Sequence, residues 1–246
     1  MGAVLDRGGA SARAARRGAV SETAPARPHH ADIPAWRSRS GWAILLIVTV
    51  LALAGDLASK WAAFRTIAPD PVVITKPEVL SADQLGYLIP AHDVVTVVPH
   101  GLELTLVLNE GAVFGMAAGQ TWFFVAFTVV ALGFCCWMFA SWTHARDRVA
   151  HVAIALVLAG GLGNLYDRLM FACVRDFLHF LPGVHLPFGL AWPGGETEVW
   201  PYVSNVADAE LIVGIALLIW FSLRAPAHAK ADDERKPDGT SDASAA

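Results

Sequence analysis

The sequence predicts a mainly α-helical membrane protein with four transmembrane helices and a small β-rich outer-surface element between the first and second helices. Of its 246 residues, 55% are hydrophobic and only 16% are charged, whereas soluble domains carry about 25% charged residues. Four apolar runs are each long enough to cross a hydrocarbon core about 30 Å thick as a helix. One segment between the first two runs alternates apolar and polar residues, which is the period of a strand.

The four predicted spans are residues 42–63, 121–142, 149–171 and 204–224. The second and third are separated only by the turn THARDR, which predicts an antiparallel helical hairpin. The small-residue stretch LALAG at 51–55 leaves open a cleaved signal peptide in place of the first span. The apolar run continues to Phe64, however, and the preceding region is unusually long for a signal peptide.

Basic residues are distributed unevenly between the two sides of these spans. The N-terminal segment, the THARDR turn and the C-terminal segment hold most of them: Arg7, Arg13, Arg16, Arg17, Arg27, Arg37, Arg39, Arg146, Arg148, Arg224, Lys230, Arg235 and Lys236. The long connections at 64–120 and 172–203 hold only Arg65, Lys76 and Arg175. The positive-inside rule therefore predicts that both termini and the turn are cytoplasmic and that the long connections lie outside.

The chain divides into a membrane domain at 42–224 and two terminal segments. Residues 1–41 are rich in Ala, Arg, Gly and Pro, and residues 225–246 mix Ala with charges. Neither composition can bury a core, so both segments are predicted to be disordered cytoplasmic tails.

The first outer connection is predicted to contain strands. In LELTLVLN at 102–109, leucines occupy every second position, so they would share one face of a strand. VVTVV at 94–98 and PVVIT at 71–75 are further strand candidates. We expect a small sheet that rests on the outer membrane surface.

Polar side chains within the spans gather near their outer ends. Asp56 and Lys60 are four residues apart in the first span, and Asn205 and Asp208 are three apart at the start of the fourth. Such spacings place both members of a pair on one helix face. The third span carries Asn164, Asp167 and Arg168 in its outer half. Intramembrane polar groups at one depth indicate a functional site, although the first pair alone fits an interfacial ion pair and Asp208 alone fits a helix cap.

Asp176 and Asp208 are the candidate catalytic pair. Two carboxylates held close together share a proton, and their titration belongs to the pair. One can then act as general base on a water while the protonated one polarises a carbonyl group. This is the acid–base requirement of an aspartic peptidase.

Other functions fit the residues less well. His179 and His185 near Asp176 suggest a metallopeptidase, but no His-Glu-x-x-His motif is present. Cys173 has no base at a spacing that would activate it. A small transporter or a non-catalytic membrane scaffold would also use intramembrane charges, but transport sites usually lie near the midplane. No metal or cofactor is predicted, and no basic stripe indicates nucleic-acid binding.

Five motifs together resemble the lipoprotein signal peptidase family, the type II signal peptidases of bacteria. In sequence order they are GDLASKW (55–61), NEGAVFGM (109–116), GGLGNLYDRL (160–169), VRDF (174–177) and NVADAEL (205–211). The resemblance implies an intramembrane aspartic peptidase of the bacterial inner membrane, with four transmembrane helices and its active site near the outer leaflet. It implies partners too: membrane lipid, and prolipoprotein substrates whose cysteine carries a diacylglyceryl group, with cleavage before that cysteine.

The resemblance also implies a role for each matching residue. Asp176 and Asp208 match the catalytic pair. The supporting and substrate-binding positions are matched by Asp56, Lys60, Asn109, Gly111, Ala112, Phe114, Asn164, Asp167, Arg168 and Asn205.

This sequence departs from the family pattern in two ways. Glu110 and Val113 stand where the family usually has a small or hydroxyl residue and an alanine. The stretches 61–108 and 178–203 are longer than expected, and the second is rich enough in Pro, Gly and Trp to form a lid over the site. These differences bear on substrate preference and not on the chemistry.

Overall fold

The structure is a computed structural model that describes residues 33–111 and 121–234. Within them, four helices are long and apolar enough to cross a membrane, which confirms the predicted mainly helical membrane class. Their bounds are Arg39–Thr66 (α1), Thr121–Trp142 (α3), Arg148–Phe171 (α4) and Val206–Glu234 (α5). α5 is helical beyond residue 224, where the fourth predicted span ends. Residues 1–32 and 235–246 lie outside the described part of the chain, so disorder there stays a prediction.

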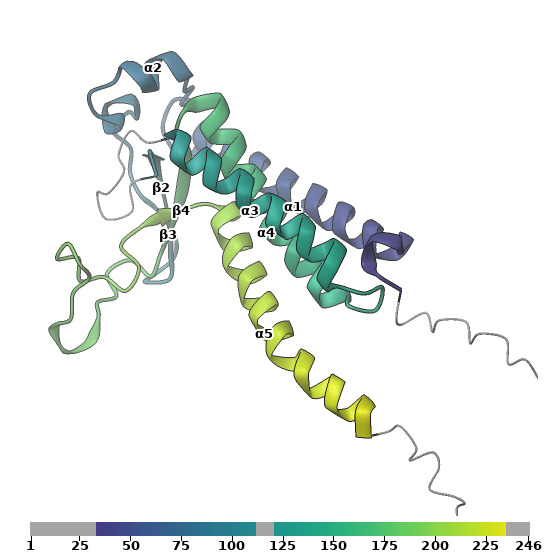
Figure 1. Cartoon of the computed structure of the whole chain (residues 1–246). Helices are drawn as coiled ribbons and strands as arrows, with labels where there is room; N and C mark the ends of the chain where they lie inside the picture. The colour runs from purple at the N-terminus through teal and green to yellow at the C-terminus, as the bar shows by residue number, and fades with distance from the viewer. Residues whose placement is uncertain (1–32, 112–120, 235–246) are drawn as a thin grey trace, which may run out of the picture.

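α4 is the central helix of the bundle. In its most apolar stretch 61% of the residues are buried, against 17% in α1 and α3 and 11% in α5. Close packing requires its glycines, because a Cβ on Gly160 would collide with the carbonyl oxygen of Ala207 on α5. Figure 1 shows that α5 leaves the other helices as it runs away from the sheet.

The outer unit expected from the sequence corresponds to one antiparallel sheet with strand order β1-β2-β3-β4. The bounds are Val95–Val98 (β1), Leu102–Asn109 (β2), Val174–Phe180 (β3) and Val203–Ser204 (β4). Both long connections therefore contribute to it: β1 and β2 lie between α1 and α3, and β3 and β4 lie between α4 and α5 (Figure 1). The strands predicted at 102–109 and 94–98 are confirmed.

The strand predicted at 71–75 is wrong. This segment has no ladder partner and leads instead into the short helix α2 (Lys76–Ser81). Val72 donates its amide to the carbonyl of Phe64 at 2.7 Å, and the side chains of Val72 and Ile74 are buried. The apolar side chains of this segment thus pack against the end of α1, and the segment does not pair with another strand.

A hydrophobic core joins the sheet to the helix ends. It combines Phe64 of α1, Leu106 and Leu108 of β2, and Cys173 and Phe177 around β3. The predicted alternation of β2 is therefore correct on its leucine face. This core holds the ends of β2 and β3 against α1 and α4.

The 3-10 turns are Ala35–Arg37 (η2), Leu85–Leu88 (η3) and Pro187–Gly189 (η4).

Candidate active site

Asp176 reaches the site because the chain turns sharply where α4 ends. Ala172 adopts a left-handed conformation with φ of 62°, which ends the helix and directs the chain into β3. β3 then pairs with β2, so that Asp176 lies opposite Val107. The side chain is only 1% exposed, and its Oδ2 accepts a hydrogen bond of 3.0 Å from Nδ2 of Asn109.

Asp208 is held in the first turn of α5 by a reciprocal pair of hydrogen bonds. The amide of Asn205 donates to Oδ2 of Asp208, and the amide of Asp208 donates to Oδ1 of Asn205, both at 3.1 Å. This is the geometry of a capping box. The helix-cap interpretation of Asp208 is therefore correct as far as it goes, but the same carboxylate also faces the other polar side chains.

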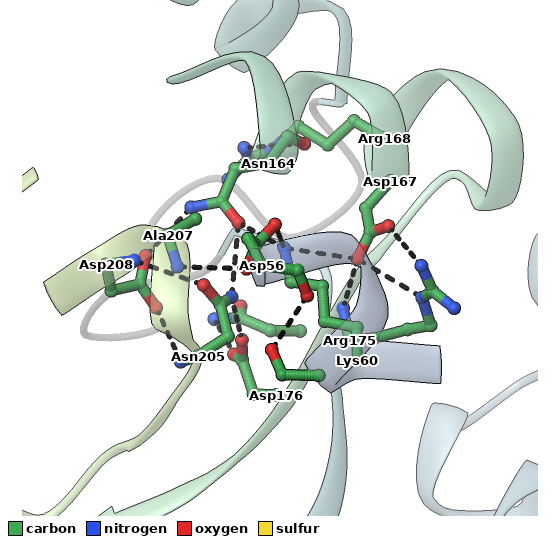
Figure 2. Close-up of polar contacts among 12 residues, drawn as sticks. Asp56, Lys60, Asn164, Asp167, Arg168, Arg175, Asp176, Asn205, Ala207 and Asp208 are labelled. Carbon is green, nitrogen blue, oxygen red and sulfur yellow. Dashed lines mark hydrogen bonds and ion pairs between the residues drawn. The ribbon is translucent and has the colours of Figure 1, made fainter. Parts of the chain in front are cut away.

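Two amides connect the carboxylates of Asp176 and Asp208, as Figure 2 shows. Nδ2 of Asn205 donates to Oδ1 of Asp176 at 2.6 Å and to Oδ1 of Asn164 at 3.1 Å. Nδ2 of Asn164 in turn donates to Oδ1 of Asp208 at 2.8 Å. Residues from β3, α4 and α5 thus form one continuous hydrogen-bonded chain.

Lys60 is the buried cation of this cluster. Its Nζ lies 2.8 Å from Oδ2 of Asp56 and 3.6 Å from Oδ2 of Asp167, and all three side chains are fully buried. It also donates to Oδ1 of Asn164 at 3.0 Å. A buried charge needs such partners, because burial without them costs several kcal/mol. Asp56 additionally accepts the amide of Ala207 at 2.9 Å, which ties α1 to the start of α5.

Arg175 and Asp167 form a second ion pair beside the first. Nη2 of Arg175 lies 2.8 Å from Oδ1 of Asp167, and both the backbone amide and Nε of Arg175 donate to Oδ2. The pair links β3 to α4 and thereby locks the turn that carries Asp176.

The environment of Asp176 disfavours its ionised form. Burial in the protein, and then the nearby charge of Asp208, raise the pKa of Asp176 to about 7 from an ordinary value of 3.8. The hydrogen bonds from Asn109 and Asn205 oppose this rise without cancelling it. A carboxyl group that titrates near neutral pH is suited to general acid–base work.

Both aspartates open onto one groove of about 870 Å³. Asn109, Glu110 and Arg168 lie on its wall, as do Leu211 and Ile212 of α5. The two longer stretches contribute most of the remaining wall, with Leu85, Gly86, Val107 and Leu108 from the first and 200–203 from the second, and Ser204 completes it. The part of 178–203 that borders the groove is therefore its C-terminal end.

Most of the predicted site residues come together in this cluster, and the other four are Arg168, Gly111, Ala112 and Phe114. Among the described residues, Arg168 donates a hydrogen bond only to the carbonyl of Asn164 on its own helix, at 3.3 Å, although its side chain lines the groove. Gly111 lies behind Asn109 with φ of 92°, where a Cβ would meet the ring of Phe124. Ala112 and Phe114 lie outside the described residues.

The structure also assigns partners that the motifs left open. Arg175 is adjacent to Asp176 in the sequence, yet its side chain pairs with Asp167. Alternation along a strand would have indicated this, because consecutive side chains point to opposite faces. Glu210 is a further buried acid, with no hydrogen-bond partner for its Oε2 among the described residues. The sequence could have indicated Glu210, because it is a carboxylate that lies one helical turn inside an apolar run.

The rival nucleophile and metal ligands lie in environments that do not suit those roles. Cys173 is fully buried, and burial raises the pKa of its thiol to about 12, which disfavours the thiolate that a thiol peptidase needs. His179 lies 3.3 Å from Glu198 and 3.9 Å from Glu103, and His185 bonds Thr197. In the part of the chain that the structure describes, no three His, Cys, Asp or Glu residues form a metal-binding group.

Comparison with known proteins places this geometry in a family. A family model described as signal peptidase (SPase) II matches residues 48–224, a range that contains every member of the cluster. The lipoprotein signal peptidase of Azoarcus sp. (strain BH72) is 34% identical over 160 residues, which are 63% of this chain and 77% of that protein. The lipoprotein signal peptidase of Syntrophotalea carbinolica is 32% identical over 164 residues, which are 65% of this chain and 92% of that protein.

Two solved structures share the fold. Both are described as a bacterial membrane enzyme determined by the in meso method, and both are 23% identical to this chain. The structure at 1.9 Å resolution has a TM-score of 0.53 and covers 74% of this chain and 94% of its own. The one at 2.3 Å has a TM-score of 0.50 and covers 80% and 93%.

Proposed function

The chain belongs to the signal peptidase II family, and from this premise we propose that it is an intramembrane aspartic endopeptidase. Its proposed substrates are prolipoproteins with a diacylglyceryl-modified cysteine, and the bond to be cut precedes that cysteine. One observation carries the proposal: Asp176 and Asp208 are joined through two buried amides and open onto the same groove.

In the proposed mechanism the two carboxyl groups share one proton, which Asp176 holds because its pKa is raised to about 7 by burial. Ionised Asp208 takes a proton from a water, whose oxygen attacks the carbonyl carbon, while Asp176 protonates the carbonyl oxygen. A neutral gem-diol results. Its carbon–nitrogen bond then breaks as Asp208 protonates the leaving amine and Asp176 takes back a hydroxyl proton.

The groove walls suggest how the substrate is held. Leu211 and Ile212 offer apolar contacts on the α5 side, where a signal peptide would lie. Arg168 lines the groove, and its Nε has no hydrogen-bond partner among the described residues. We propose that Arg168 donates a hydrogen bond to a backbone carbonyl of the substrate. A buried donor without a partner is costly, so an acceptor that enters the groove would stabilise it.

The proposed orientation follows from the distribution of basic residues. The sheet and the two aspartates would lie at the outer surface of the bacterial inner membrane, with both termini and the α3–α4 turn in the cytoplasm. A membrane-impermeant maleimide should label Asp93→Cys but not Arg146→Cys in intact spheroplasts, with Cys136, the exposed native cysteine, replaced by alanine. The opposite labelling would invert the topology.

The direct test is cleavage of a diacylglyceryl-modified prolipoprotein by the purified protein and its variants. Asp176→Asn and Asp208→Asn should each abolish turnover, because either change removes a group that must exchange a proton. Asp93→Asn is the matched control, since this exposed aspartate lies in the outer unit away from the groove. It should cleave at the parental rate, and a chelator should have no effect.

Three outcomes would contradict the proposal. Full turnover by either folded site variant would remove that aspartate from the mechanism. Inhibition by the chelator would point to a metal-dependent peptidase. A well-folded parent with no cleavage would favour a scaffold that keeps the fold without the reaction.

A further inference from the structure

Residues 181–202, between β3 and β4, form an arm that stands away from the sheet (Figure 1). The arm is internally hydrogen bonded rather than extended at random. Leu186 donates to the carbonyl of Thr197 and Val199 to that of Val184, both at 2.7 Å. Trp192 donates to the carbonyl of Glu196 at 2.8 Å. The arm therefore has a defined shape, and its backbone groups are largely paired within it.

The distal part of the arm presents large apolar side chains to its surroundings. Phe188 is 99% exposed, Leu190 57% and Trp192 39%. Phe188 also has φ of 60°, a left-handed conformation that a bulky side chain rarely adopts. Such conformations cluster at functional positions. Here it holds an aromatic ring away from the protein.

The arm carries two acidic residues, the exposed Glu196 and the half-buried Glu198. No lysine or arginine occurs between Arg175 and Arg224. Glu198 is engaged at the base, where Oε1 accepts the amide of Gly183 at 3.1 Å and Oε2 lies 3.3 Å from His179. Its partners thus keep this carboxylate beside the sheet and away from Phe188.

The root of the arm adjoins the point where the chain enters its last transmembrane helix. β4 ends at Ser204, and α5 begins two residues later at Val206. Figure 1 shows that the arm leaves the sheet on the side away from α2. Its apolar residues therefore belong to a segment that leads directly into a helix apolar enough to cross a membrane.

We propose that the arm is a membrane-surface anchor, whose Phe188, Leu190 and Trp192 insert into the leaflet at the sheet end of the helices. The partner is the lipid surface itself, recognised by partition of apolar and aromatic side chains. Aromatic residues favour this interface, where their rings meet both acyl chains and water. Without basic residues, the contact does not depend on anionic headgroups. The anchor fixes the position of Trp200–Ser204, which form one wall of the groove.

Spin labels in nanodiscs that hold a single copy of the protein test this proposal. The labels are attached to Phe188→Cys and, as the matched control within the same arm, to the exposed Glu196→Cys. Both variants carry Cys136→Ala, because Cys136 is the exposed native cysteine while Cys135 and Cys173 are buried. Relaxation by dissolved oxygen, which concentrates in lipid, is compared with relaxation by a water-soluble nickel chelate.

The label at 188 should be relaxed mainly by oxygen, and the label at 196 mainly by the nickel chelate. The result should be the same in phosphatidylcholine discs and in discs that contain phosphatidylglycerol. Equal nickel access at both positions would overturn the proposal, as would insertion that requires phosphatidylglycerol. Both positions are exposed, so neither substitution threatens folding.

A second measurement tests whether Phe188 causes the insertion. A label at Trp192→Cys is followed with and without the additional change Phe188→Ser. Loss of the aromatic ring should move the label at 192 towards water, with a clear rise in nickel access. No change in access would mean that Phe188 does not hold the arm on the membrane. Neither measurement depends on cleavage activity, so the anchor and the proposed chemistry can fail separately.

Discussion

Replacement of Asn109 by alanine removes one of the two side-chain donors to the Asp176 carboxylate. The pKa of Asp176 is about 7 in the folded protein, against an ordinary value of 3.8, and burial is the largest cause. That difference corresponds to about 4 kcal/mol of added cost for the ionised form. The bond from Asn109 opposes the cost, because it stabilises the carboxylate.

The sign of the expected effect follows from this role. A donor that stabilises the carboxylate lowers the pKa, so its removal must raise the pKa of Asp176 further. A hydrogen bond to a charged group contributes about 1.5–3 kcal/mol, which is about one to two pH units. In the proposed mechanism Asp176 must be protonated, so the alkaline limb of the pH profile of kcat/KM should move to higher pH by about that amount.

The assay is cleavage of a lipid-modified prolipoprotein across the neutral and alkaline range by the parent and by Asn109→Ala. Asn109 has two roles: its Nδ2 donates to Asp176, and its Oδ1 accepts the amide of Gly111 at 2.8 Å. Asn109→Asp separates them, because its carboxylate can still accept the amide of Gly111 but cannot donate to Asp176. The added negative charge should shift the limb in the same direction. Thr105→Val, on the same strand, is the control and should leave the profile unchanged. An alkaline limb that stays in place or moves to lower pH in Asn109→Ala would refute the reasoning.

Three further substitutions test the cluster and its surroundings. Lys60→Met should lower the Tm strongly, because it leaves the buried carboxylate of Asp56 without its cation. Removing one partner of a buried ion pair costs about 3–5 kcal/mol. An unchanged Tm would mean that this pair is not ionised. Gly163→Ala should destabilise the protein by about 1–3 kcal/mol, because its Cβ would collide with Oδ2 of Asp56, whereas Gly55→Ala, with open space around it, should not lower the Tm. Cys173→Ala should cleave at the parental rate in the same assay, and a large loss of kcat would revive the thiol mechanism.

The helices and the β2 strand could be predicted, because the patterns that indicate them lie within short stretches of the chain. The four helices are apolar over the length of a bilayer, and the leucines at 102, 104, 106 and 108 alternate as a strand requires. At 71–75 the run of valine and isoleucine predicted a strand wrongly, because such a run indicates a buried segment and not the identity of what covers it. There the cover is the end of α1 and not another strand.

β3 was missed for a related reason. VRDF was noticed as a motif after the third span, but its structure depends on pairing with β2, more than sixty residues earlier in the chain. The partner of Arg175 follows from the same strand, since β3 turns Asp176 towards Asn109 and Arg175 towards Asp167.

The sequence by itself determined which segments are apolar enough to cross a membrane, and that their polar residues gather near one end. Hydropathy and charge are sums over neighbouring residues, so they need no knowledge of the fold. Only the tertiary structure decided which side chains meet: Lys60 bonds Asn164 across 104 positions of sequence, and Asp56 bonds Ala207 across 151. Those bonds exist because glycines on α4 let three helices approach closely, and hydrogen bonds require atoms about 3 Å apart, whatever their separation along the chain.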